Sequence, residues 1–189
     1  MSQFSARLVS IVFHPLLVVT IFVFGYIQAL YGIEVAKKIL LLITFVAVLP
    51  IVLYNSIQLI RGKISNFDLS NRDERNKTYP YLMLLLGLLI ALGYYYRLPV
   101  KLVGQLVIYA LMIVVFYFFR NHLKISLHAS TSFFLAMMVF SDFKWIGFIA
   151  IMISAVVALS RVALKRHTLK EVIVGSGSGI IAGLLSSLI

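Results

Sequence analysis

Long apolar runs separated by short polar loops are the feature of this sequence that most constrains its fold. Seven runs can be placed, at about residues 7–30, 38–60, 79–96, 99–119, 127–141, 144–160 and 171–189. A helix needs about 20 mostly apolar residues to cross about 30 Å of hydrocarbon, and most of these runs provide them. We therefore expect an all-α fold, a polytopic membrane helix bundle of six or seven transmembrane helices.

The span count is six or seven because two of the runs are short. Asp142, Phe143 and Lys144 interrupt the fifth and sixth runs, and a run of about 15 residues spans only where its ends are thinned or buried in the bundle. The first run, from Ala6 to about Leu30, is expected to be a retained span. Since 62% of the 189 residues are hydrophobic and 12% charged, we expect one integral membrane domain, 1–189, without an ordinary soluble domain.

Polar residues concentrate in three loops, at 61–78, 120–126 and 161–170. Two apolar runs separate each loop from the next, which places all three on one membrane face. The basic residues on that face are Arg7, Arg61, Lys63, Arg72, Arg75, Lys77, Arg120, Lys124, Arg161, Lys165, Arg166 and Lys170, against Lys37, Lys38, Arg97, Lys101 and Lys144 on the other. The positive-inside rule favours a cytoplasmic face. Cations that bind phosphate would bias this count, so the sidedness stays open.

The net charge of +11 does not indicate a nucleic-acid partner, because the basic residues lie in short loops between apolar runs. Orientation in the membrane and contact with anionic headgroups explain them better. We expect a multi-pass protein of the cell (inner) membrane. Cysteine is absent, which excludes disulfides, iron–sulfur clusters and thiolate zinc sites and leaves histidine, carboxylate and hydroxyl chemistry.

The most specific arrangement of polar residues lies near the C-terminus. Ser160 and Arg161 are followed after five residues by His167, and after three more by Glu171. Residues four apart share a helix face, so Glu171 can accept the ring N–H of His167 and leave the other nitrogen as a nucleophile. Arg161 offers a planar fork of donors that suits phosphate oxygens. A single histidine can also be a packed polar residue, but these two neighbours favour a functional one.

This run resembles the third signature of the type-2 phosphatidic acid phosphatase superfamily, Ser-Arg-x5-His-x3-Asp, with Glu171 in place of the aspartate. The stretch Ile125-Ser126-Leu127-His128 is similar to the second signature, Pro-Ser-Gly-His, at its serine and histidine.

The first signature of that superfamily, Lys-x6-Arg-Pro, is similar to Arg72, six residues, Tyr79 and Pro80. Tyr79 carries no charge, so Arg75 or Lys77 would have to supply the second cation. The three motifs follow the family order and cover about residues 72–171. The resemblance implies a phosphatase-like core over about 61–189.

The resemblance implies a metal-independent lipid phosphatase with no cofactor. His167 would attack phosphorus, and His128 would protonate the leaving alcohol and then activate water. Its implied phosphate-binding residues are Arg161, Ser126, Arg72, Arg75, Lys77 and Lys124. The partner would be a membrane lipid that carries phosphate or diphosphate, such as phosphatidate, phosphatidylglycerol phosphate or a polyprenyl diphosphate. The sequence does not choose among these lipids.

Two other functions stay open. A membrane prenyltransferase would need acidic residues on two loops to hold magnesium, whereas the sequence has one acidic cluster, Asp68, Asp73 and Glu74, which we expect to pair with neighbouring cations. The departures at Tyr79, Leu127 and Glu171 leave room for a catalytically silent binder or transporter of anionic lipids.

Two further features are interpreted as structural. His14 beside Pro15 is expected to mark a kink in the first span. Gly175, Gly179 and Gly183 recur at four-residue spacing in the last run, which lets membrane helices approach closely and would hold His167 firmly at the helix entrance.

Overall fold

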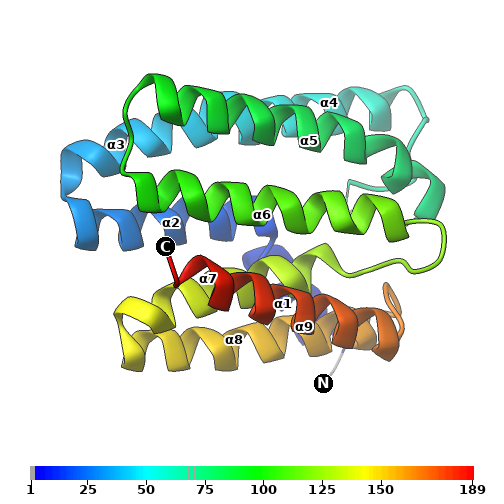
Figure 1. Ribbon diagram of the computed structural model, residues 1–189. Helices are drawn as coiled ribbons and strands as arrows, with labels where there is room; N and C mark the ends of the chain where they lie inside the picture. The colour runs from blue at the N-terminus through cyan, green and yellow to red at the C-terminus, as the bar shows by residue number, and fades with distance from the viewer. Residues whose placement is uncertain (1–2, 68, 70) are drawn as a thin grey trace.

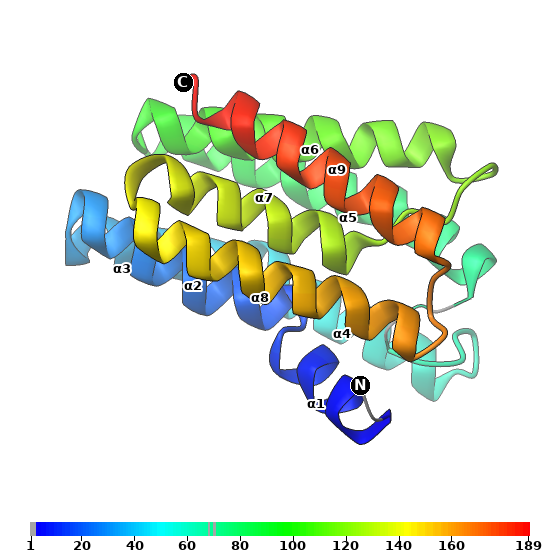
Figure 2. The ribbon, with the colours of Figure 1, turned by 90° about the horizontal axis from the view of Figure 1, so that it is seen from below.

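The computed structural model describes residues 3–67, 69 and 71–189, and its regular structure there is helical (Figure 1). The elements are α1 (Gln3–Val12), α2 (Pro15–Tyr31), α3 (Ile33–Leu42), η1, a π-helix (Ile43–Val48), α4 (Leu49–Ile60), α5 (Arg72–Tyr95), α6 (Val100–Phe119), α7 (Leu127–Asp142), α8 (Lys144–Ala163) and α9 (Leu169–Ser186). The helices α2 to α9 run roughly side by side along the long axis of the molecule (Figures 1 and 2). The all-α expectation is confirmed.

Five helical segments of the described chain are long and apolar enough to cross a membrane. They are Ile33–Ile60, Arg72–Tyr95, Val100–Phe119, Lys144–Ala163 and Leu169–Ser186. The apolar helices α2 and α7 are shorter, with 17 and 16 residues. Large apolar side chains point outward from the long segments: Leu84, Phe118 and Trp145 are 67%, 70% and 85% exposed. An outer surface of this kind suits lipid rather than water.

The first apolar run is not one continuous helix, so the expected single span from Ala6 to Leu30 is wrong in this respect. The chain leaves the helical conformation at His14, where φ is −63° and ψ is 133°, and α2 begins at Pro15. Proline restricts the preceding residue to extended conformations and is favoured in the first helical turn. The predicted kink at His14 is therefore confirmed, and α1 lies beside the bundle against α8 (Figure 2).

The second run forms one continuous segment, α3, η1 and α4, which begins at Ile33 rather than near Lys38. The π-helical turn Ile43–Val48 ends two residues before Pro50. Proline has no N–H to donate to the preceding turn, and a locally wider turn lets the helix continue past it.

The three polar loops lie at the same end of the molecule, as the count of apolar runs predicted. The α4–α5, α6–α7 and α8–α9 connections meet at the right of Figure 1, whereas the C-terminus lies at the other end. We call the end with the three connections the loop end.

Close backbone contact between the parallel helices α7 and α9 fixes the loop end. A Cβ atom at Gly179 would lie 2.2 Å from the carbonyl oxygen of Ser130, and one at Gly175 would lie 2.8 Å from that of Ser126. Any side chain larger than hydrogen would push the helices apart. The predicted tight packing of this glycine stripe is thus confirmed, and it brings the starts of α7 and α9 together.

Candidate functional site

His167 lies in the α8–α9 connection, directly before Thr168, the N-cap of α9. Its Nδ1 is 3.0 Å from the carbonyl oxygen of Lys124. A carbonyl oxygen only accepts, so the proton of the neutral ring is on Nδ1 and Nε2 carries the lone pair. The α6–α7 connection therefore fixes the tautomer that a nucleophilic histidine needs.

The electrostatic surroundings keep His167 neutral. Burial, followed by the charges of Lys124, Arg161 and Arg75, lowers the pKa of His167 to about 4. The hydrogen bond to Lys124 O acts the other way and is outweighed. Three cations thus act on a buried, neutral ring, an arrangement that attracts an anion and presents a nucleophile to it.

Glu171 has two roles at the start of α9. Its Oε2 is 3.4 Å from Nδ1 of His167, so the two side chains meet although His167 precedes α9 and does not share a helix face with Glu171 as expected. The same oxygen accepts the Thr168 N–H at 2.9 Å, while the Thr168 hydroxyl accepts the Glu171 N–H at 3.3 Å, which forms a capping box. The main partner of the His167 ring is therefore the Lys124 carbonyl, and Glu171 chiefly fixes the first turn of α9.

Arg161 occupies the last turn of α8 and is 1% exposed. Its Nη1 donates to the hydroxyl of Ser10 in α1. This contact joins the N-terminal helix to the cation group around His167, although no sequence motif linked the two.

Arg75 is the second buried cation, 5% exposed on α5. Its Nη1 donates to Ile125 O at 2.9 Å, while Nε and Nη2 have no hydrogen-bond partner within the described chain. Buried guanidinium donors are normally satisfied, so these two are suited to the oxygens of an anion. Arg72, at the start of the same helix, donates from Nε to Arg120 O at 2.9 Å.

The structure distinguishes between Arg75 and Lys77, which the sequence left as alternatives. Lys77 is exposed and lies on another face of α5. It lines a surface pocket between α5 and α6, with Asp73, Asn76, Tyr117, Arg120 and Asn121. Arg75, not Lys77, therefore lies in the group around His167.

The α6–α7 connection contributes Lys124 and Ser126. Lys124 Nζ donates to Arg166 O at 2.8 Å, and burial, then the charge of Arg75, lowers its pKa. Ser126 is fully buried as the N-cap of α7: its hydroxyl accepts the Ala129 N–H at 3.4 Å, and its own N–H donates to Glu171 O at 3.3 Å. Ser126 thus links α7 to α9. Its hydroxyl and its N–H, the two groups of this residue that could bind phosphate, already have hydrogen-bond partners within the protein.

His128 lies in the first turn of α7 and is 7% exposed. Its ring meets the ring of His14 edge to face, with centroids 5.2 Å apart and an interplanar angle of 88°. From the sequence, His14 was expected only to mark a kink. The one signal for its contact with His128 was the presence of a histidine at a helix break.

His14 is held in a defined tautomer by its own helix. Nδ1 accepts the Leu16 N–H at 3.3 Å as the side-chain cap of α2. In the neutral ring the proton is then on Nε2, so His14 can act as a hydrogen-bond donor.

The acidic residues of the first polar loop take separate positions. Glu74 accepts hydrogen bonds from the N–H and hydroxyl of Ser65 at 3.0 and 3.1 Å, and Asp68 lies outside the described residues. In the part of the chain that the structure describes, no group of three or more His, Asp or Glu residues could hold a metal ion.

Comparison with known proteins identifies no relative, since no family model, curated protein or solved structure matches this chain.

Proposed function

We propose that this chain is an integral membrane phosphatase that removes phosphate from a lipid phosphate or diphosphate through a phosphohistidine at His167. The observation that carries the proposal is the state of His167: a buried, neutral ring with Nδ1–H bound to a backbone carbonyl, among the cations Lys124, Arg161 and Arg75. Such a site combines a nucleophile with fixed positive charge where phosphate would bind.

In the first step, Nε2 of His167 attacks phosphorus and the bond between phosphorus and the lipid oxygen breaks. His128 donates a proton to that oxygen, which leaves as the alcohol or, from a diphosphate, as the monophosphate. Arg75, Arg161 and Lys124 stabilise the charge on the equatorial oxygens, and Arg72 acts from the edge of the group. Fixed cations do the work that a metal ion does in other phosphoryl-transfer enzymes.

In the second step, water attacks the phosphohistidine while His128 accepts its proton. The bond between phosphorus and Nε2 breaks, which releases inorganic phosphate and restores the neutral ring of His167. The ring of His14 lies against His128 and supports its orientation through both steps.

The membrane arrangement that fits this function has seven spans. These are α2, the segment α3 to α4, α5, α6, α7, α8 and α9, with α1 against the outside of α8 at the loop end. The phosphatase-like region from about residue 61 then includes the short helix α7, whose length suits a helix buried by neighbours. A location in the cell (inner) membrane is part of this proposal.

One observation favours a second candidate, a catalytically silent binder of anionic lipids. Both the N–H and the hydroxyl of Ser126 are engaged within the protein, and Leu127 follows where a glycine would let a phosphate approach the backbone. A pocket of this kind could hold phosphate through its arginines without positioning it for attack.

The test is phosphate release from a panel of lipid phosphates and diphosphates by detergent-purified protein in excess chelator. The variant His167→Ala removes the nucleophile, and His122→Ala, an exposed histidine at the same end, is the matched control. We expect release by wild type and His122→Ala and a loss of at least about a thousandfold in His167→Ala. Phosphate binding without release from any lipid would instead support the silent binder, and release that needs added metal would exclude the proposed mechanism.

A further inference from the structure

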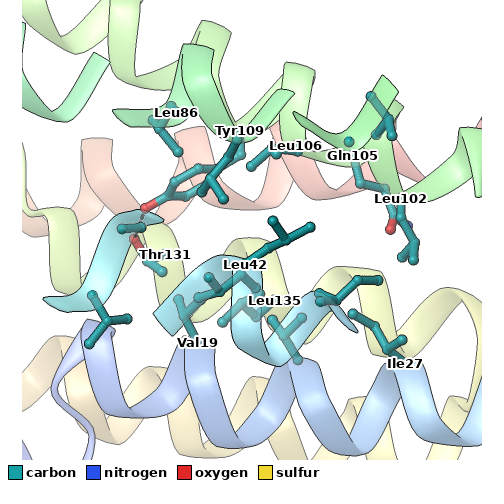
Figure 3. Close-up of a pocket in the computed structure, with 18 of the residues that line it drawn as sticks. Val19, Ile27, Leu42, Leu86, Leu102, Gln105, Leu106, Tyr109, Thr131 and Leu135 are labelled. Atoms are coloured by element: carbon teal, nitrogen blue, oxygen red, sulfur yellow. Dashed lines mark hydrogen bonds between the residues drawn. The ribbon is translucent and has the colours of Figure 1, made fainter. Parts of the chain in front are cut away.

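A cavity of about 190 Å³ lies inside the bundle, between α2, the segment α3 to α4, α5, α6 and α7 (Figure 3). Its lining is almost wholly apolar. Val19, Leu42, Leu86 and Leu135, from four separate helices, line the same space (Figure 3). Apolar cavities of about 150 Å³ are known to stay dry and to bind small hydrocarbons. The cavity is therefore suited to an apolar ligand rather than to water.

Most polar groups in the lining form hydrogen bonds within the protein. The hydroxyls of Tyr109 and Thr131 form a hydrogen bond of 2.8 Å, drawn as a dashed line in Figure 3. Nε2 of Gln105 donates to the Tyr26 hydroxyl at 3.5 Å, while its Oε1 has no hydrogen-bond partner within the described chain. Gln105 lies in the half of the cavity that is farther from the loop end. Its polar Oε1 makes that half the least favourable for a hydrocarbon chain.

The helix faces that carry the site continue into this cavity. On α7, Thr131 follows His128 by three residues and Leu135 follows Thr131 by four, so all three share one face. Thr131 is about 4.5 Å from His128 along the helix axis. On α5, Leu82 and Leu86 continue the buried face of Arg75 in the same way. The polar site and the apolar cavity thus share faces of α5 and α7.

The depth of the cavity corresponds to one lipid leaflet. On α5 its lining extends from Leu82 to Gly93, which at 1.5 Å per residue is about 16 Å. Half of a hydrocarbon core about 30 Å thick is about 15 Å. A lipid with its phosphate at the loop end would place one chain along this length.

We propose that the cavity binds one hydrocarbon chain of the lipid whose phosphate binds near His167, an inference that rests on the proposed function. The substrate class is a lipid phosphate or diphosphate with at least one chain that inserts between the helices instead of staying in the bilayer. Acyl and isoprenoid chains share the required chemistry, and the test below separates them.

The test is thermal stabilisation of the detergent-purified protein by phosphonates, which have no phosphate ester bond to hydrolyse. One series carries straight alkyl chains of increasing length, and a second carries isoprenoid chains. Ala47→Phe fills the cavity from η1, and Ala91→Phe makes the same change at an exposed position of α5. Val19→Phe on α2, with the exposed Val115→Phe as control, provides a second pair in case Ala47→Phe does not fold.

We expect the affinity of wild type, Ala91→Phe and Val115→Phe to rise about fourfold per buried methylene and to level off beyond one leaflet depth. In Ala47→Phe and Val19→Phe this dependence on chain length should disappear. The series with the steeper rise identifies the chain type.

Equal dependence on chain length in the cavity variants and their controls would overturn the inference, as would a wild type that does not distinguish chain lengths. Failure of the proposed function looks different: stabilisation would depend on chain length while no lipid phosphate is hydrolysed.

Discussion

The two nitrogens of the His167 ring have different surroundings, and at the residue scale the proposed chemistry depends on this difference. Nδ1 is bound to Lys124 O, so Nε2 is the nitrogen that would attack phosphorus in the proposed mechanism. The pKa of about 4 means that the folded protein holds the ring neutral while an unfolded chain would bind a proton. Stability is therefore lost as the pH falls from about 6.5 to about 4, by on the order of 3 kcal/mol at most.

Lys124→Met tests how the nearby cation tunes His167. Burial is the larger cause of the low pKa and Lys124 the next, so we expect the pKa of His167 to rise by about one unit toward its ordinary value. The acidic limb of the pH–rate profile should shift to higher pH by the same amount, even where the maximal rate falls. A limb that stays in place would show that His167 does not set it.

His14→Asn tests the contact between His14 and His128. Asparagine can still cap α2, so the melting temperature should stay near that of wild type. Removing the ring should lower kcat about ten- to a hundredfold, with little change in KM, because His128 loses its neighbour. An unchanged kcat would limit His14 to its role as a cap.

At the scale of elements, the parallel pair α7 and α9 positions the site, because each helix start carries part of it. His128 lies in the first turn of α7, and His167 directly precedes the cap of α9. The glycine stripe lets the two backbones touch, so the relative position of the two histidines depends on α7–α9 packing.

Gly179→Ala tests this dependence. The added Cβ would meet Ser130 O at 2.2 Å, so we expect a loss of about 2–4 kcal/mol in the free energy of unfolding and a large loss of activity. Gly177→Ala is the matched control, since its Cβ would meet nothing within 4 Å, and it should stabilise α9 by about 0.5–1 kcal/mol. Equal melting temperatures for the two variants would contradict the packing account.

Much of the fold follows from the sequence. Runs of apolar residues predict the helices, and the number of runs between two loops predicts whether those loops lie at the same end of the molecule. The break at His14, the capping box and the stripe of glycines each have a local signal. The position of α1 does not, because the contact of Ser10 with Arg161 joins residues 151 apart. The choice of Arg75 over Lys77 also needed the structure, since two residues along a helix turn a side chain to another face.

At the scale of the whole molecule, eleven of the 17 basic residues lie in the three polar connections of the loop end or in the helical turns next to them. The apolar cavity lies inward from that end, between helices whose outer surfaces are also apolar. Charge at one end and hydrocarbon space behind it suit an amphiphile that approaches in the plane of the membrane. These features of the whole molecule support the proposed lipid substrate over a soluble one.

The central claim is a covalent phosphohistidine, and trapping it is the most direct measurement. Wild-type protein would be mixed with a lipid phosphate that it hydrolyses, denatured rapidly in alkali and mapped by peptide mass spectrometry, with His167→Ala as control. The structure predicts phosphate on Nε2 of His167, because Nδ1 is bound to the Lys124 carbonyl. Phosphate on Nδ1, on another residue, or on no residue during measurable turnover would contradict the account.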